Sequence, residues 1–485
     1  MEHILQDLHY FFFYSLKQPW FFTEYSFLLC LVMFLVGYAF FAPKSKWKLG
    51  YLIAFSLFFY YKSSGPFLLL FIAVILCDYL LARWLNGLEG TKRKLLLFFS
   101  VVYGLSFLLY FKYSNFFIEN LNFFFNTSFS PKNLFLPIGI SFYTFQSLSY
   151  LIDVYRKEIE PSNNVVEYSF YMTFFPHLVA GPIVRAKDFL PQIQHPLTFD
   201  QPLLKESLLR ITTGLVKKLL IADFLGKYVT LIHDAPSGFS GLEHALSMYA
   251  YSFQIYFDFS GYSDIAIGIA LILGYRMKEN FFNPYTAENI TVFWRKWHIS
   301  LSLWLRDYIY IPMGGNRRGV VNMYIFLFLT MLIGGIWHGA NWKFILWGCA
   351  HGMLLIVHKL FFKQTGNPTR WAKVLGIAFT FHLVGILWIF FRASSVETAF
   401  ESIRIMGTSF NPVDLVGFCY TRPEITGLLL LSAFIVFLPW HLKQTLINRI
   451  LSLPLYLWPL ILLFALQLIL QFRDNSIEPF IYFQF

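Results

Sequence analysis

Two histidines stand in polar segments between apolar runs, where they could transfer protons. His338 lies in the segment 334–342, GGIWHGANW, and His298 lies in the segment 294–307, WRKWHISLSLWLRD. The ordinary pKa of histidine, about 6.5, suits general acid–base catalysis, and glycines on both sides of His338 let backbone and ligand approach closely. A hydrogen-bonded loop histidine is the alternative explanation of His338, and a surface amphipathic helix is that of His298. The residues alone leave both open.

Two carboxylates, Asp258 and Asp264, stand in the segment 257–264, FDFSGYSD, again between apolar runs. Charged groups at membrane depth are costly and need partners. They either orient a histidine or form ion pairs with Arg295 or Arg306 that brace the helices. The ion pairs are the favoured interpretation.

Other chemistries lack their sequence signatures. His351 follows His338 by thirteen positions, about 20 Å along a helix, so the two cannot share a site. His351 and His358 share a helix face, but no third ligand stands at H-E-x-x-H spacing. We therefore predict no metal site and no bound cofactor. There is also no G-x-S-x-G elbow and no phosphate-binding glycine loop.

The elements that position these residues must lie in a membrane. Apolar residues make up 57% of the 485 positions and charged residues only 13%, whereas soluble proteins carry roughly 25% charged residues. The composition excludes a soluble enzyme and predicts an all-α, polytopic integral membrane protein, because helices satisfy their own backbone in lipid. We expect roughly 11 to 13 membrane helices, some partial or re-entrant. The apolar runs are 25–42, 52–61, 67–81, 95–110, 136–151, 170–180, 247–257, 265–275, 320–336, 342–360, 374–391, 426–439 and 457–472.

Basic residues set the expected orientation. The net charge of +11 lies in short loops between the apolar runs, which argues against nucleic-acid binding. Lys44, Lys46 and Lys48 precede the run 52–61, and the cluster 92–94 follows two runs later. By the positive-inside rule both loops are cytoplasmic and the N-terminus is outside. The segment 203–232 reads as an amphipathic surface helix with Lys205, Arg210, Lys217, Lys218 and Lys227 on its polar face.

At these residues the sequence resembles the membrane-bound O-acyltransferase family, in its bacterial alginate O-acetyltransferase-type branch. The resemblance is dense over about 95–391, within one domain spanning 1–485. The matching motifs lie at 136–146, 175–185, 258–264, 294–307, 310–317, 337–342, 390–393 and the terminal FIYFQF, 480–485.

The resemblance implies a helical fold around a central tunnel, with His338 catalytic and His298 as the second active-site histidine. His177 stands in one of the motifs but is not expected to be catalytic. Further residues are expected along the substrate path: Trp337, Asn341, Ser302, Asp258, Asp264 and Arg295.

The implied activity is an O-acetyltransferase of the bacterial inner membrane that acts on an exported polysaccharide. Acetyl-CoA is the expected donor, attracted by the basic segment 276–318. Besides membrane lipid, the expected partner is a periplasmic or membrane-anchored O-acetyltransferase. Three alternatives stay open: D-alanyl transfer from a carrier protein to teichoic acid, a proton-coupled transporter, and a scaffold for a polysaccharide-modifying complex.

Overall fold

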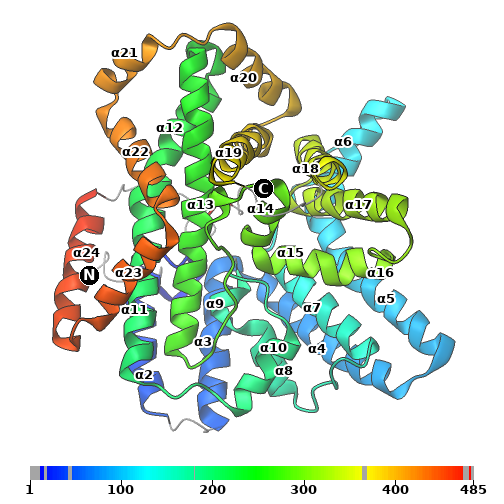
Figure 1. Ribbon diagram of the computed structural model, residues 1–485. Helices are drawn as coiled ribbons and strands as arrows, with labels where there is room; N and C mark the ends of the chain where they lie inside the picture. Colours follow the sequence, from blue (N-terminus) through cyan, green and yellow to red (C-terminus); the bar gives the residue numbers. More distant parts are fainter. Residues whose placement is uncertain are drawn as a thin grey trace. The chain divides into compact units, whose positions relative to one another are not determined.

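The structure is a computed structural model that describes residues 11–15, 19–41, 46–179, 181–362, 369–472 and 480–481. Lys44 and the terminal residues 482–485, which figure in the orientation and in the last motif, lie outside the described residues. Every regular element in the described ranges is a helix (Figure 1). The chain forms two compact units: unit 1 comprises 1–204 and 266–278, and unit 2 comprises 205–265 and 279–485. The expected single domain over 1–485 stays a prediction.

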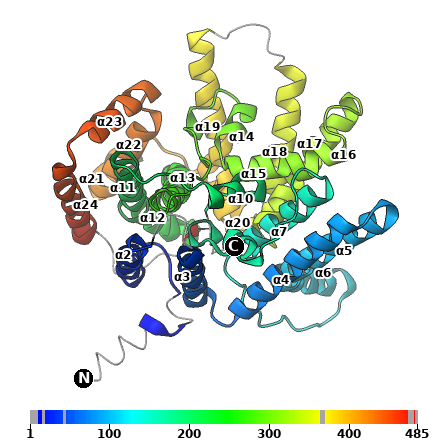
Figure 2. The ribbon, with the colours of Figure 1, turned by 90° about the horizontal axis from the view of Figure 1, so that it is seen from below.

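Unit 1 is a helical bundle around α7, whose side chains are almost all buried. Helices α4 and α5 pack on α7 (Figure 2), and α3 packs on α8. A small residue allows one close approach, because a side chain at Gly104 would lie 3.1 Å from Leu148. The elements are α2 (Tyr25–Ala39), α3 (Lys46–Ser64), α4 (Phe67–Gly87), α5 (Gly90–Leu108), the π-helix Leu109–Tyr113, α6 (Ser114–Phe125), α7 (Ile140–Tyr155), α8 (Val165–Thr173), α9 (Phe175–Leu178) and α10 (Ala186–Gln194).

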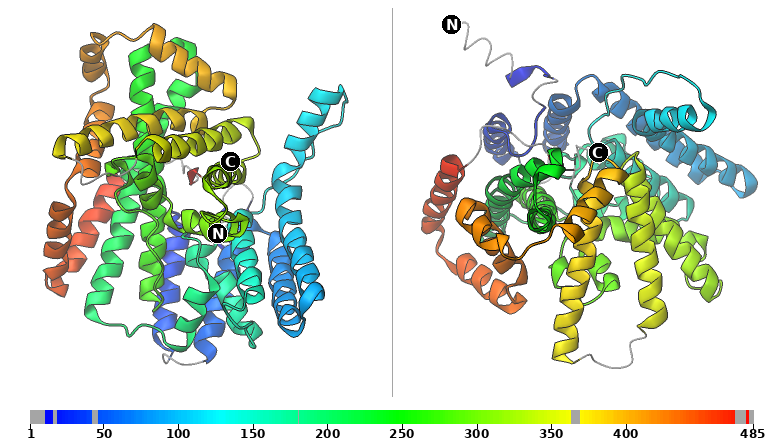
Figure 3. Two further views of the ribbon diagram at one scale, coloured as in Figure 1. Left: turned by 45° about the vertical axis from the view of Figure 1, so that its right-hand side comes forward. Right: turned by 90° about the horizontal axis from the view of Figure 1, so that it is seen from above.

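Unit 2 holds both candidate histidines and the remaining helices, except for the first residues of α11, up to Leu204, and the end of α13, from Ala266, which belong to unit 1. Helices α17 and α18 form an antiparallel pair, and α19 packs beside α18 (Figure 3). The elements are α11 (Gln201–Val216), the π-helix Lys217–Ala222, α12 (Asp223–Asp234), a 3₁₀ turn Pro236–Gly238, α13 (Gly241–Ile272), a 3₁₀ turn Pro284–Thr286, α14 (Ile290–Lys296), α15 (Ile299–Leu305), the π-helix Arg306–Tyr310, α16 (Ile311–Met313), α17 (Val320–His338), α18 (Trp342–Phe361), α19 (Arg370–Arg392), α20 (Val396–Thr408), α21 (Asp414–Thr421), α22 (Pro423–Phe437), α23 (Trp440–Ser452), a 3₁₀ turn Leu455–Leu457 and α24 (Trp458–Phe472).

Seven helices among the described residues are long and apolar enough to cross a membrane, so the chain is a multi-pass, all-α membrane protein. An eighth span results if α21 and α22, bent by 102°, count as one. The spans are Phe67–Gly87, Gly90–Phe125, Gly241–Ile272, Val320–His338, Trp342–Phe361, Arg370–Arg392 and Leu455–Phe472. Other expected segments form shorter helices, such as the 15 residues of α2 and the 16 of α7.

Helix α13 differs from the sequence expectation. The runs 247–257 and 265–275 were expected as separate short segments, but both belong largely to one helix of 32 residues. Its most apolar window is 89% buried, so α13 is a core helix whose polar residues need partners inside the protein. Asp258 and Asp264 therefore lie within a helix and not at a break between two segments.

The amphipathic helix expected at 203–232 is also only partly as predicted. The chain is helical from Gln201 to Asp234, but a π-helix interrupts it at Lys217–Ala222. A π-turn adds a residue to the helix and rotates the later turns about the helix axis. Lys218, expected to face water, is buried, and it pairs there with Asp223 on the next turn and with Asp258 on α13.

Candidate active site

His338 is the last residue of α17 and is buried, with 5% of its surface exposed. Three aromatic rings surround its imidazole: Trp337 at 5.0 Å, Trp347 at 5.1 Å and Phe391 at 5.1 Å between ring centroids. All three meet it edge-on, an arrangement favoured between aromatic rings. His338 thus ends a membrane helix inside an aromatic box.

Glycines bring α17 and α18 together beside His338. A side chain at Gly335 would overlap the backbone oxygen of Phe344 and lie 2.9 Å from the Cα atom of Gly348. A side chain at Gly348 would in turn lie 2.6 Å from the backbone oxygen of Met331. Small residues are the usual means of close helix packing in membranes. The glycine-rich run before His338 is therefore needed for packing.

His298 is held by Asn280, which the sequence did not single out. The ring atom Nδ1 of His298 lies 3.1 Å from Oδ1 of Asn280. The same oxygen accepts hydrogen bonds from the backbone N–H of Ser300 at 3.3 Å and from its hydroxyl at 2.9 Å. Because Oδ1 acts as an acceptor throughout, the imidazole donates from Nδ1 and Nε2 is its basic nitrogen.

The backbone of His298 is strained. The residue precedes α15 with φ 41° and ψ 56°, in the left-handed region, which non-glycine residues seldom adopt. Such strain persists where surrounding contacts determine it and is frequent at functional sites. The ring of Phe259 packs edge-on at 4.6 Å, and His298 has no exposed surface. Burial lowers the pKa of His298 to about 3, so this imidazole is neutral at pH 7.

Trp337 connects the two histidines. Its ring centroid lies 5.0 Å from that of His338 and 6.3 Å from that of His298. The structure therefore brings together the three residues His298, Trp337 and His338. A further ring, Trp347, separates His338 from His351 by packing on both, at 5.1 and 4.6 Å.

In the part of the chain that the structure describes, Asn341 and Ser302 make local hydrogen bonds, and Arg295 is exposed. Asn341 caps α18, since its side chain accepts from the backbone N–H of Lys343 at 3.0 Å. The hydroxyl of Ser302 donates to the backbone oxygen of Trp297 at 3.3 Å. Arg295 is exposed on α14. Their expected roles along a substrate path stay predictions.

The two carboxylates of α13 brace the fold through partners other than those expected. Asp258 lies 2.6 Å from Nζ of Lys218, which also pairs with Asp223 at 2.7 Å. Asp264 lies 2.5 Å from Lys217 and 3.5 Å from Arg210. The partners expected from the sequence are wrong, since Arg306 pairs with Asp307 and Arg295 is exposed.

Asp258 and its neighbour Phe259 connect the last described residues to His298. The second carboxylate oxygen of Asp258 accepts the backbone N–H of Ile481 at 3.0 Å. The ring of Phe480 packs on Phe259 at 5.3 Å, and Phe259 packs on His298. Both Phe480 and Ile481 are buried. The described end of the chain is thus part of the support of the His298 side of the centre.

Sequence comparison identifies the kind of protein to which this centre belongs. The model of the membrane-bound O-acyltransferase family matches residues 20–396, a range that includes both histidines and Trp337. The chain belongs to the membrane-bound O-acyltransferase family. It is accordingly an acyltransferase.

Named relatives include two kinds of O-acetyl-transferring protein. The chain is 40% identical over 433 residues to a probable alginate O-acetylase of Pseudomonas putida, covering 86% of each chain. It is 34% identical over 409 residues to a peptidoglycan O-acetyltransferase of Helicobacter pylori, covering 78% of this chain and 76% of the relative. Identity to a teichoic acid D-alanyltransferase of Bacillus subtilis is 31% over 271 residues, which cover 52% of this chain and 68% of the relative.

Proposed function

We propose that this acyltransferase moves an acetyl group from a cytoplasmic donor, acetyl-CoA, across the bacterial inner membrane for O-acetylation of an exported polysaccharide. The observation that carries the proposal is the pair of buried histidines packed on one tryptophan, Trp337. Two of the relatives are named for O-acetylation of alginate and of peptidoglycan, and both match more than three quarters of the chain.

In the proposed reaction an acceptor hydroxyl attacks the thioester carbonyl, and His338 takes the hydroxyl proton. A C–O bond forms and the C–S bond breaks. The proton then passes from the imidazolium to the leaving sulfur, so a neutral thiol departs and His338 is restored. General base catalysis of this kind typically contributes 10²- to 10⁴-fold. The aromatic box around His338 excludes competing water.

His298 takes a different role in this scheme. Its Nδ1 hydrogen is engaged by Asn280, so Nε2 can accept a hydrogen bond but cannot donate one to a carbonyl oxygen. We assign it to hold a second hydroxyl or an amide N–H of a substrate. The pairing with Asn280 favours this role over polarisation of the thioester.

The proposal includes the orientation expected from the basic residues, in which the N-terminus is outside. Cysteines introduced at Lys46 and Lys92 should react with an impermeant thiol reagent only when the cytoplasmic face is open. A cysteine at Asn122, near the end of α6, should react in intact spheroplasts, because the segment 111–133 is poor in basic residues. Labelling of the Lys92 and Asn122 positions from the same face would overturn the orientation.

A second protein is proposed to finish the transfer outside. A polymer chain is too bulky to reach a histidine held among buried rings, whereas a small acetyl group is not. The acetyl group would therefore pass to a membrane-anchored or periplasmic O-acetyltransferase. Direct acetylation of a polymer end or of a lipid-linked sugar is the competing route.

The decisive experiment uses the purified full chain in detergent with radiolabelled acetyl-CoA. Turnover should need the candidate partner protein, and polysaccharide alone should stay unlabelled. His338→Ala should abolish label transfer at wild-type membrane abundance, while His358→Ala, which removes a half-buried histidine bonded to Thr291, should transfer normally. Full activity of His338→Ala would overturn the assignment. Turnover with a D-alanyl carrier protein but not with acetyl-CoA would favour D-alanyl transfer.

A further inference from the structure

Two histidines of α18, His351 and His358, have no role in the proposed reaction. The structure shows that both bind the short helix α14, which packs beside α18. The indole N–H of Trp294 donates to Nδ1 of His351 at 3.3 Å. The hydroxyl of Thr291, one turn earlier on α14, lies 3.0 Å from Nδ1 of His358. The histidine pair of α18 therefore holds α14 at a defined position along this helix.

This attachment connects the supports of the two active-site histidines. Helix α14 ends at Lys296, two residues before His298. Helix α18 carries Trp347, whose ring packs edge-on against His338 at 5.1 Å. The position of α14 along α18 therefore influences where His298 lies relative to His338.

His351 stands at the centre of this connection. It has no exposed surface. Its imidazole packs edge-on against Trp294 at 5.1 Å and against Trp347 at 4.6 Å. Because Trp347 packs in turn on His338, a continuous series of contacts runs from α14 through His351 and Trp347 to His338.

Stability alone does not explain a histidine at this position. An indole N–H can only donate, so Nδ1 of His351 is the acceptor and its proton lies on Nε2. Nε2 is buried and has no hydrogen-bond partner in the part of the chain that the structure describes. A buried donor without a partner destabilises a fold by about as much as one hydrogen bond stabilises it. A phenylalanine here would remove both effects, so the free energy of unfolding should change little.

We propose that His351 is a positioning residue of the active site. It keeps α14 and Trp347 in place and thereby sets the separation of His298 and His338. The inference rests on the proposed acyl transfer, because the substrate group held by His298 must line up with the base, His338. His351 itself contacts neither the thioester nor the acceptor, and it acts through Trp294 and Trp347.

Variants of the purified full chain test this role in the acetyl-transfer assay proposed above. His351→Phe keeps a ring of similar shape but offers Trp294 no acceptor. Turnover should fall about a hundredfold, because a small misplacement of reacting groups is enough for such a loss. The KM for acetyl-CoA and the unfolding midpoint should stay nearly unchanged. A purely structural role would instead lower the midpoint.

Two further variants test the hydrogen bond itself. His351→Gln offers a side-chain oxygen that can accept the indole N–H, and it should recover much of the lost turnover. Trp294→Phe removes the donor and should resemble His351→Phe. The double variant should be no worse than either single variant, because both remove the same interaction.

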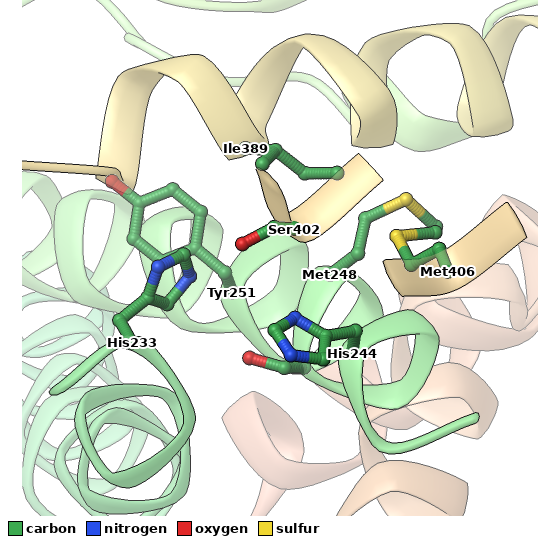
Figure 4. Close-up of a pocket in the computed structure, with 8 residues that line it drawn as sticks. His233, His244, Met248, Tyr251, Ile389, Ser402 and Met406 are labelled. Atoms are coloured by element: carbon green, nitrogen blue, oxygen red, sulfur yellow. The ribbon is translucent and has the colours of Figure 1, made fainter. Parts of the chain in front are cut away.

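Two other histidines serve as matched controls. His358→Phe removes the outer hydrogen bond to α14, where the histidine is half-buried. His244→Phe removes a buried imidazole that bonds to the backbone oxygen of Pro236 at 2.9 Å. This second control lines a small cavity formed by α12, α13, α19 and α20 (Figure 4). Both controls should keep near-normal turnover at equal amounts of folded protein.

The outcomes separate this role from the proposed function. A wild-type protein that does not transfer acetyl from acetyl-CoA would overturn the proposed function and this role with it. An active wild type together with near-normal turnover of His351→Phe would overturn the role alone. Equal losses of turnover in His351→Phe and His244→Phe, or an unfolding midpoint that falls in His351→Phe along with turnover, would also overturn it, because His351 would then serve only the stability of the fold.

Discussion

Asn280 and His298 are joined side chain to side chain, with 3.1 Å between Oδ1 and Nδ1. A backbone hydrogen bond joins the same two segments, since the N–H of Ile299 donates to the backbone oxygen of Asn280 at 2.9 Å. Asn280 is itself buried and its amide nitrogen lies 3.4 Å from the hydroxyl of Ser263 on α13. A single asparagine thus fixes the tautomer, the ring orientation and the helix start at His298.

Replacement of Asn280 should impair catalysis without unfolding the protein. In Asn280→Ala the imidazole of His298 loses the acceptor that holds its proton on Nδ1, and we expect turnover to fall about a hundredfold with a smaller change in KM. In Asn280→Asp the acceptor remains but gains a negative charge, which raises the pKa of His298. The acid limb of the pH–activity profile should therefore move to higher pH. A variant Asn280→Ala with wild-type turnover would contradict this role.

The ion pairs of α13 allow a test of how burial of an ion pair affects the stability of the protein. Lys218 is buried between Asp258 and Asp223, so Lys218→Met leaves two uncompensated carboxylates and should cost about 3–5 kcal/mol. Lys217 contacts Asp264 where about a quarter of the lysine side chain is exposed, and Lys217→Met should cost about 1 kcal/mol or less. Unfolding midpoints in detergent measure both. An equal loss for the two variants would contradict the difference in burial.

The sequence predicted the helices around His338, but it did not predict which residue supports His298. Helices α17 and α18 follow from two long apolar runs, and the break between them follows from the glycines and Asn341, which caps α18. The sequence could not predict that Asn280 supports His298, because eighteen positions of irregular chain and short helix separate them. Asparagine carries no pattern that distinguishes a buried acceptor from a loop residue.

The charged residues show the same limit. The lysines of the segment 203–232 have the spacing of a solvated helix face, but Lys218 stands in the π-helix Lys217–Ala222 and pairs with Asp258. A π-turn depends on tertiary contacts and leaves no periodic signature. The sequence correctly indicated that the two aspartates are braces, but their partners depend on the packing of α13 against this interrupted helix.

Stability at acid pH should depend on His177. Burial lowers the pKa of this imidazole to about 3, although its hydrogen bond to the backbone oxygen of Tyr171 opposes the shift. The unfolded chain takes up the proton near pH 6.5, so the stabilisation is complete above pH 6.5 and is lost as the pH falls toward 3. One pH unit below 6.5 costs about 1.4 kcal/mol. His177→Gln should flatten the decline of the unfolding midpoint from pH 6.5 to 5.5, while His195→Gln, which changes an exposed histidine, should leave it unchanged.

Two neighbouring glycines on α17, Gly334 and Gly335, allow the effect of helix packing to be measured apart from the effect of helix propensity. A methyl group at Gly335 meets the backbone of Phe344 and of Gly348, neither of which can move without separating α17 from α18. A methyl group at Gly334 meets only the end of the Leu305 side chain, at 3.1 Å, which can rotate away. Because His338 ends α17 and Trp347 lies on α18, Gly335→Ala should displace the imidazole from its ring contacts and lower turnover about a hundredfold. Gly334→Ala makes the same change in helix propensity and should retain near-normal turnover. The difference in turnover is measured as acetyl transfer by the two purified variants at equal amounts of folded protein. Wild-type activity of Gly335→Ala would show that the close contact of α17 and α18 does not position His338.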